Sequence, residues 1–73
     1  MKLPRGLSGH ACVKALGRFG FEVHHQVGSH IVLRRRNGSG RVVVPAHASL
    51  DVGTLKSILE QAGVTRDEFL EVL

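Results

Sequence analysis

Three histidines and three arginines fall within the thirteen-residue segment HHQVGSHIVLRRR, residues 24–36. An imidazole titrates near neutral pH and can move protons, whereas a guanidinium holds phosphate oxygens through paired hydrogen bonds. RNA carries its own nucleophile, the 2′-hydroxyl, so its cleavage needs little more than these two groups. His30 and Arg34 are four residues apart and are expected on one exposed face of a strand. They could meet one RNA segment, although spacing alone favours a plain surface histidine beside a turn.

The histidines do not form a metal-binding pattern. His24 and His25 are adjacent, so they are expected on opposite faces of a strand. No His-x-His or His-x-x-x-His pair precedes a carboxylate anywhere in the chain. We therefore expect no metal ion and no cofactor, and we expect any nuclease activity to be metal-independent.

Two further chemistries are disfavoured by residue type. Ser29 precedes His30, but no buried acid is available to orient an imidazole for nucleophilic catalysis. Cys12 falls on the apolar face of a helical pattern and is expected to pack in the core. The chain has no Trp or Tyr, and its three Phe residues all fit the core, so no aromatic platform remains for stacking single-stranded bases.

Length and charge limit the class of protein. The 73 residues suit one domain spanning residues 1–73, with no apolar run near the roughly 20 residues of a membrane span. A single cysteine excludes an internal disulfide, and the cytoplasm is the expected compartment. Residues 1–56 carry nine basic against two acidic residues, whereas residues 57–73 carry one against four. One end of the protein is therefore expected to attract polyanions such as nucleic acid.

Apolar periodicity predicts a helix at each end of the chain. Ser8 is an expected N-cap, and the helix behind it runs to Gly20, with Gly17 as a weak point in its middle. A second helix is expected to open at Gly53–Thr54, with Thr54 as its cap, and to end at Gly63. A capping-box pattern at residues 65–68 predicts a short third helix.

Three strands are expected between the two main helices, at residues 21–27, 30–36 and 41–45. Gly28–Ser29 fits a two-residue hairpin turn, and residues 37–40 form a second turn, so the strands run antiparallel. Period two places His25 inward with the neighbouring apolar residues of its strand and places Gln26 outward. The predicted fold is a small two-layer α+β domain of order α-β-β-β-α, with both helices on one face of the sheet.

The chain contains four blocks in this order: Gly20-Phe21, Gln26-x-Gly28-Ser29-His30, Val44-Pro45-x-His47 and Gly53-Thr54-Leu55-x-x-Ile58-Leu59-x-x-Ala62-Gly63. Together they resemble the HicA family of toxin mRNA interferases. The resemblance runs from Ser8 to Phe69. It implies a fold like that of double-stranded-RNA-binding domains and ribosome-independent cleavage of mRNA. It also implies a HicB-type antitoxin that covers the active site, and it makes His30 the catalytic histidine.

The expected site combines this resemblance with the charge pattern. His30 is the catalytic general base or acid. The expected RNA-binding residues are Lys14, Gln26, Ser29, Arg34 and Arg36. Secondary candidates are His25, His47 and Thr54. The family usually has a basic residue at the position of His25, so RNA affinity here could be weaker or pH-dependent unless His25 is structural.

The expected partners are an mRNA substrate and a HicB-type antitoxin, without a membrane, and the free protein is expected to be a monomer or a weak dimer. Two other functions fit the same residues. One is a non-catalytic module that recognises double-stranded RNA by its shape, and the other is a domain whose basic face docks an acidic protein.

Overall fold

The computed structural model describes residues 3–73, and residues 1 and 2 of the expected single domain lie outside this range. The helices and strands are α1 (Gly9–Leu16), β1 (Phe21–Val27), β2 (His30–Arg35), β3 (Arg41–Pro45), α2 (Val52–Ala62) and α3 (Arg66–Glu71), with a short 3-10 turn over Gly17–Phe19. The sheet is antiparallel in the order β1-β2-β3. The structure confirms the α+β prediction of helix, three strands and helices.

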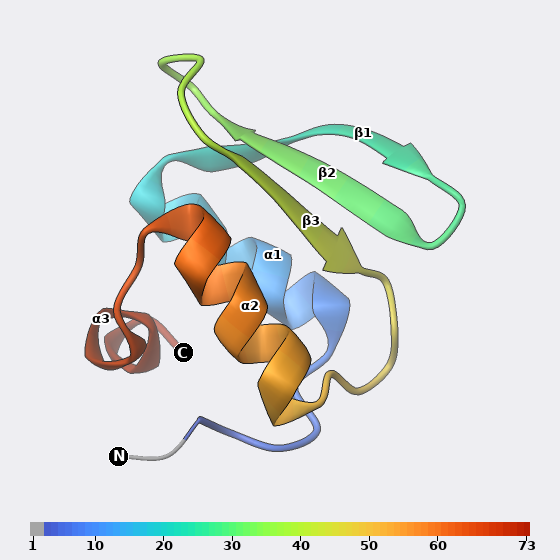
Figure 1. Ribbon diagram of the computed structural model, residues 1–73, viewed down its shortest axis with the longest axis vertical. Coiled ribbons are helices and arrows are strands. Elements are labelled where there is room, and N and C mark those ends of the chain that lie inside the picture. The colour runs from blue at the N-terminus through green and yellow to red at the C-terminus, as the bar shows by residue number, and fades with distance from the viewer. Residues whose placement is uncertain (1–2) are drawn as a thin grey trace.

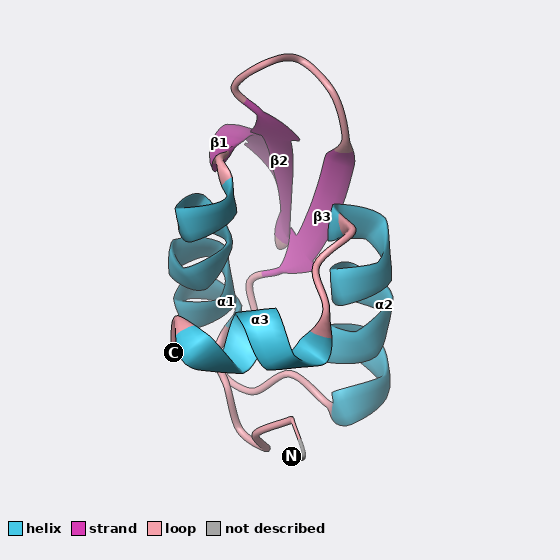
Figure 2. Cartoon of the chain, turned by 90° about the vertical axis from the view of Figure 1, so that its left-hand side faces the viewer, coloured by secondary structure: helices cyan, strands magenta, loops and turns pink. Residues whose placement is uncertain are grey.

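The two main helices cover one face of the sheet (Figure 1). α1 contacts β1 and β3, and α2 contacts β3 and α3. α3 lies across the helical layer between α1 and α2, on the side away from the strands (Figure 2). We call the sheet face that the helices cover the inner face and the opposite one the outer face.

Apolar side chains from every element meet between the two layers. No polar or charged side chain is buried among the described residues. Phe69 of α3 is fully buried, so even the short third helix is anchored in the core. The largest fully buried side chains are Cys12, Leu16, Leu33, Val42, Val44, Leu55, Ile58 and Phe69. Burying these groups supplies the main driving force for folding a domain of this size.

Helix boundaries follow from capping, with two corrections to the sequence prediction. The Ser8 hydroxyl accepts a hydrogen bond from the amide of Ala11 at 3.1 Å, as expected. Gly17 does not weaken the middle of α1 but ends it, and the chain continues as a 3-10 turn to Gly20, at φ 85°. The cap of α2 is Asp51, whose carboxylate accepts from the amide of Thr54 at 2.6 Å, so Thr54 is not the cap.

The hairpin between β1 and β2 confirms the predicted two-residue turn. Gly28 has φ 57° and no residue other than glycine has positive φ in the described chain, which is the pattern of a turn with glycine at its first central position. Val27 therefore pairs directly with His30. β3 is an edge strand of the sheet, and one of its free backbone groups is paired by a side chain, because the side-chain oxygen of Gln61 accepts from the amide of Val43 at 3.2 Å.

A β-bulge at His24 changes the faces of β1. The register pairs Val23 with Leu33 and then His25 with Val32, so His24 is an extra residue opposite β2. Directly paired residues share a face, so His25 lies on the outer face with Val32. The prediction that His25 points inward is wrong. Gln26 pairs with the buried Ile31, so it lies on the inner face and not on the predicted outer one, although it is exposed to solvent as predicted.

Candidate functional site

His30 begins β2 on the outer face of the sheet and is exposed to solvent. Its cross-strand partners are Val27 of β1 and Pro45 of β3, so it sits in the central strand at the end nearest the hairpin. The backbone beside it is fixed on both sides, because the carbonyl of Ser29 accepts from the amide of Ala46 at 2.6 Å. A rigid turn and a paired strand thus hold an accessible imidazole in one place.

His24 and His25 come together instead of separating. Their Nδ1 atoms are 2.7 Å apart, and the two rings meet edge to face with centroids 5.0 Å apart. The bulge places both residues opposite Val32, which is only 4% exposed although it lies on the outer face. The side chains around Val32 therefore cover it, and the prediction that the strand period separates these two histidines is wrong.

The arginines of β2 divide between the two faces. Arg34 lies on the outer face, paired with Glu22 and Arg41, about 13 Å along the strand from His30. Arg36 is exposed, and its Nε lies 3.7 Å from a carboxylate oxygen of Glu22. An ion pair this exposed contributes little stability, so Arg36 remains available to a ligand.

Arg35 has a structural role, which the sequence analysis did not predict. Its guanidinium lies 4.5 Å from the centroid of the Phe21 ring and donates to the carbonyls of Phe19 and Ala62, at 3.1 and 2.7 Å. It therefore joins β2 to the end of α2. Period two was the available signal, because it places Arg35 on the same face as Ile31 and Leu33.

Three further candidates surround the hairpin end of the sheet. Gln26 donates from its side chain to the carbonyl of Gly28 at 2.9 Å, which braces the turn before His30. Ser29 is exposed in the turn itself. The carbonyl of His47 accepts from the amide of Gly9 at 2.9 Å, so the start of α1 lies against the loop after β3, while the residue as a whole is exposed.

Lys14 and Thr54 lie on the helical layer instead. Lys14 of α1 and Arg18 of the following 3-10 turn line a groove of about 720 Å³, together with Leu7 and the C-terminal Leu73. Thr54 is in the first turn of α2, where its amide is already bound by Asp51. The structure does not bring either residue to the outer face that carries His30.

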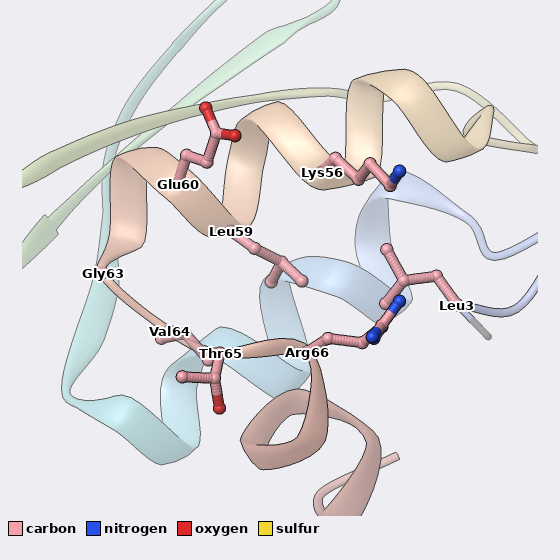
Figure 3. Close-up of a pocket in the computed structure, with 8 residues that line it drawn as sticks. All are labelled: Leu3, Lys56, Leu59, Glu60, Gly63, Val64, Thr65 and Arg66. Carbon is pink, nitrogen blue, oxygen red and sulfur yellow. The ribbon is translucent and has the colours of Figure 1, made fainter. Parts of the chain in front are cut away.

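A second hollow, of about 330 Å³, lies between α2 and the segment that leads into α3 (Figure 3). Lys56 and Arg66 both extend along it toward Leu3, whereas Glu60 lies farther along α2. It belongs to the helical layer and contains none of the histidines.

Within residues 3–73, no group of three or more His, Cys, Asp or Glu side chains could hold a metal ion. None of the described helices is long and apolar enough to cross a membrane. Burial raises the pKa of the Cys12 thiol to about 11, so this thiol stays protonated and unreactive at neutral pH.

The chain matches a known protein family. A family model described as HicA toxin of bacterial toxin–antitoxin matches residues 9–64. This range is more than half of the chain and includes every candidate site residue named above. No curated protein matches the chain.

Proposed function

Because this chain belongs to the HicA toxin family of bacterial toxin–antitoxin systems, we propose that it is a toxin that acts by cleaving mRNA, with His30 as a proton-transfer group. Family membership makes the protein a toxin with an antitoxin partner. The finer steps, which are RNA as substrate and His30 as the catalytic group, are the proposal.

The observation that carries the proposal is the position of His30 on an open sheet face. Its imidazole is exposed at the end of a rigid strand, and Arg34 lies on the same face farther along that strand. A histidine so placed can take a proton from a 2′-hydroxyl or give one to a leaving oxygen. An extended backbone lying along β2 would have its phosphates near cationic side chains.

The arginines act on the substrate by charge. Arg34 and the weakly paired Arg36 are exposed at the far end of β2 and can each hold phosphate oxygens through two hydrogen bonds. The 2′-hydroxyl is the nucleophile, so the reaction as proposed requires no metal ion. In this proposal, a HicB-type antitoxin inhibits the toxin by covering the outer face around His30.

The proposal is tested with purified protein and single-stranded RNA in a buffer that contains a chelator. The wild type is compared with His30→Gln and with His10→Gln, a matched control that removes another exposed histidine, in the first turn of α1. We expect His30→Gln to lower kcat/KM by about 10²–10⁴-fold, the usual contribution of one acid–base group, and His10→Gln to cleave at the wild-type rate.

Two outcomes would count against the proposal in different ways. Equal cleavage by the wild type and His30→Gln would remove His30 from the mechanism. Binding of double-stranded RNA without cleavage of any RNA would instead identify a non-catalytic module.

A further inference from the structure

Cleavage at a 2′-hydroxyl involves two proton transfers, and His30 supplies only one group for them. A base takes the proton from the attacking 2′-oxygen, and an acid gives a proton to the departing 5′-oxygen. A second proton carrier must therefore lie within reach of the same phosphate. The outer face of the sheet contains such a group, and the sequence prediction had placed it in the core.

The bulge brings His25 to His30. His25 pairs with Val32 and His30 pairs with Val27, so the two histidines are diagonal neighbours on adjacent strands. Diagonal neighbours on one face lie about 7–8 Å apart, within reach of aromatic side chains. Both residues are exposed, so a phosphodiester can lie over the two rings at once.

The contact with His24 occupies Nδ1 of His25 and leaves Nε2 as the ring nitrogen available to a substrate. The 2.7 Å contact between the two Nδ1 atoms requires a proton on one of them and none on the other. When Nδ1 of His25 donates to His24, Nε2 of His25 remains free. The contact persists when Nε2 of His25 is also protonated, because His24 still accepts. A ring in this state carries an N–H at Nε2 that is free to be donated.

We infer that His25 is the general acid of the reaction and that His30 is its general base. This inference rests on the proposed function. Neutral His30 takes the proton of the 2′-hydroxyl as the 2′-oxygen bonds to phosphorus. The bond from phosphorus to the 5′-oxygen breaks, and His25 gives that oxygen its Nε2 proton. The products are a 2′,3′-cyclic phosphate and a 5′-hydroxyl, and proton exchange with water resets both rings.

The other charged groups around His25 come from the sheet alone. His24 contacts it on its own strand, and Arg34 is its other diagonal neighbour on β2. Arg41 of β3 and Glu22 of β1 share the row of Arg34. The helices lie on the inner face and contribute no group. One base and one acid predict a bell-shaped dependence of kcat/KM on pH.

The test compares two substrates that differ in one atom. One is ordinary RNA, and the other carries sulfur in place of the departing 5′-oxygen, which makes a leaving group that needs no proton. We expect His25→Gln to cleave ordinary RNA about 10²-fold or more slowly than wild type and to cleave the sulfur substrate at close to the wild-type rate. His30→Gln should be defective on both substrates, because it lacks the base. His10→Gln should match the wild type on both.

The results separate this inference from the proposed function. Equal loss on both substrates in His25→Gln would overturn the acid role and indicate substrate binding instead. Wild-type activity of His25→Gln on ordinary RNA would overturn it as well, while leaving His30 in place. A wild type that cleaves neither substrate would contradict the proposed function and this inference together. His25 is exposed and lies outside the core between the two layers, and circular dichroism checks that the substitution beside Val32 leaves the fold intact.

Discussion

The role of a side chain in this protein depends on whether it lies in the core between the two layers or at the surface. Cys12 and His25 show the contrast, because one is a reactive residue type placed in the core and the other a polar residue placed at the surface. The Cys12 side chain is fully buried between the layers. Burial penalises the thiolate, so the pKa of the Cys12 thiol rises from 9.0 to about 11.

This burial predicts a loss of stability at alkaline pH. In the unfolded chain the thiol ionises near its ordinary pKa, whereas the folded protein keeps it protonated up to about 11. Between these values the unfolded state binds fewer protons, so the free energy of unfolding falls as the pH rises, by about 2–3 kcal/mol in total. Urea unfolding from pH 8 to pH 11 measures the fall, and Cys12→Ala should lack this part of it.

At the scale of single residues, the sequence predicted the direction of some side chains correctly and of others wrongly. His30 was placed outward correctly because Ile31 and Leu33 fix the inner face of β2. His25 was placed inward wrongly because period two was counted from Phe21 without a break. A signal was available in the sequence. Val27 lies opposite His30 across a two-residue turn, and partners in a pair share a face, so Val27 could not point inward.

Elements were predicted more reliably than contacts between them. The strands, the Gly28–Ser29 turn and the capping box at Thr65 follow from local rules, and the structure confirms them. The cap of α2 was misassigned because Asp51 and Thr54 are both good capping residues and only their geometry decides. The close contact between α1 and β3 is a tertiary feature that no local pattern reveals.

That contact predicts opposite effects for two glycine substitutions in the first helical segment. A Cβ on Gly9 would overlap the carbonyl oxygen of Pro45, whereas a Cβ on Gly17 would meet no atom within 4 Å. We expect Gly9→Ala to lower the free energy of unfolding by about 1–3 kcal/mol through overpacking. Gly17 has φ −57°, which alanine adopts without strain. Gly17→Ala should therefore raise the free energy of unfolding by about 0.4–1 kcal/mol, because alanine reduces the freedom of the unfolded chain.

Chemical denaturation of both variants measures the two effects under the same conditions. Equal stability of Gly9→Ala and the wild type would mean that α1 does not lie against Pro45. Gly17→Ala serves as the control, because it makes the same chemical change where there is space.

In the whole molecule, charge is distributed over both layers rather than at one end. The acidic residues of α3 lie on the far side of the helical layer from the strands (Figure 2). Arg34, Arg36 and Arg41 lie along one end of the sheet, whereas Lys14 and Lys56 lie on the helices. The sequence predicted one basic end and one acidic end. The acidic residues do gather on α3, but folding divides the basic residues between the sheet and the helical layer.

This division predicts which cations matter for RNA. Arg34→Gln should lower kcat/KM and reduce the slope of log kcat/KM against log salt concentration by about one, because it removes one phosphate contact. Lys56→Gln makes a comparable loss of charge on the helical layer and should leave the slope unchanged. Cleavage rates from 50 to 300 mM salt provide the measurement. The same slope in both variants would mean that RNA does not lie along β2.

The extra residue in β1 has a consequence for the gene as well as for the protein. Phe21 fixes the strand at one end and the tight turn fixes it at the other. The bulge between them therefore accommodates one residue more than the pairing with β2 requires, which is one codon in the gene. Deleting the codon for His24 would leave both anchors in register and remove one imidazole only. The alternation of side chains between the two faces of β1 should therefore be counted backward from the turn. Relatives that differ by one residue in this strand should be aligned from the turn as well.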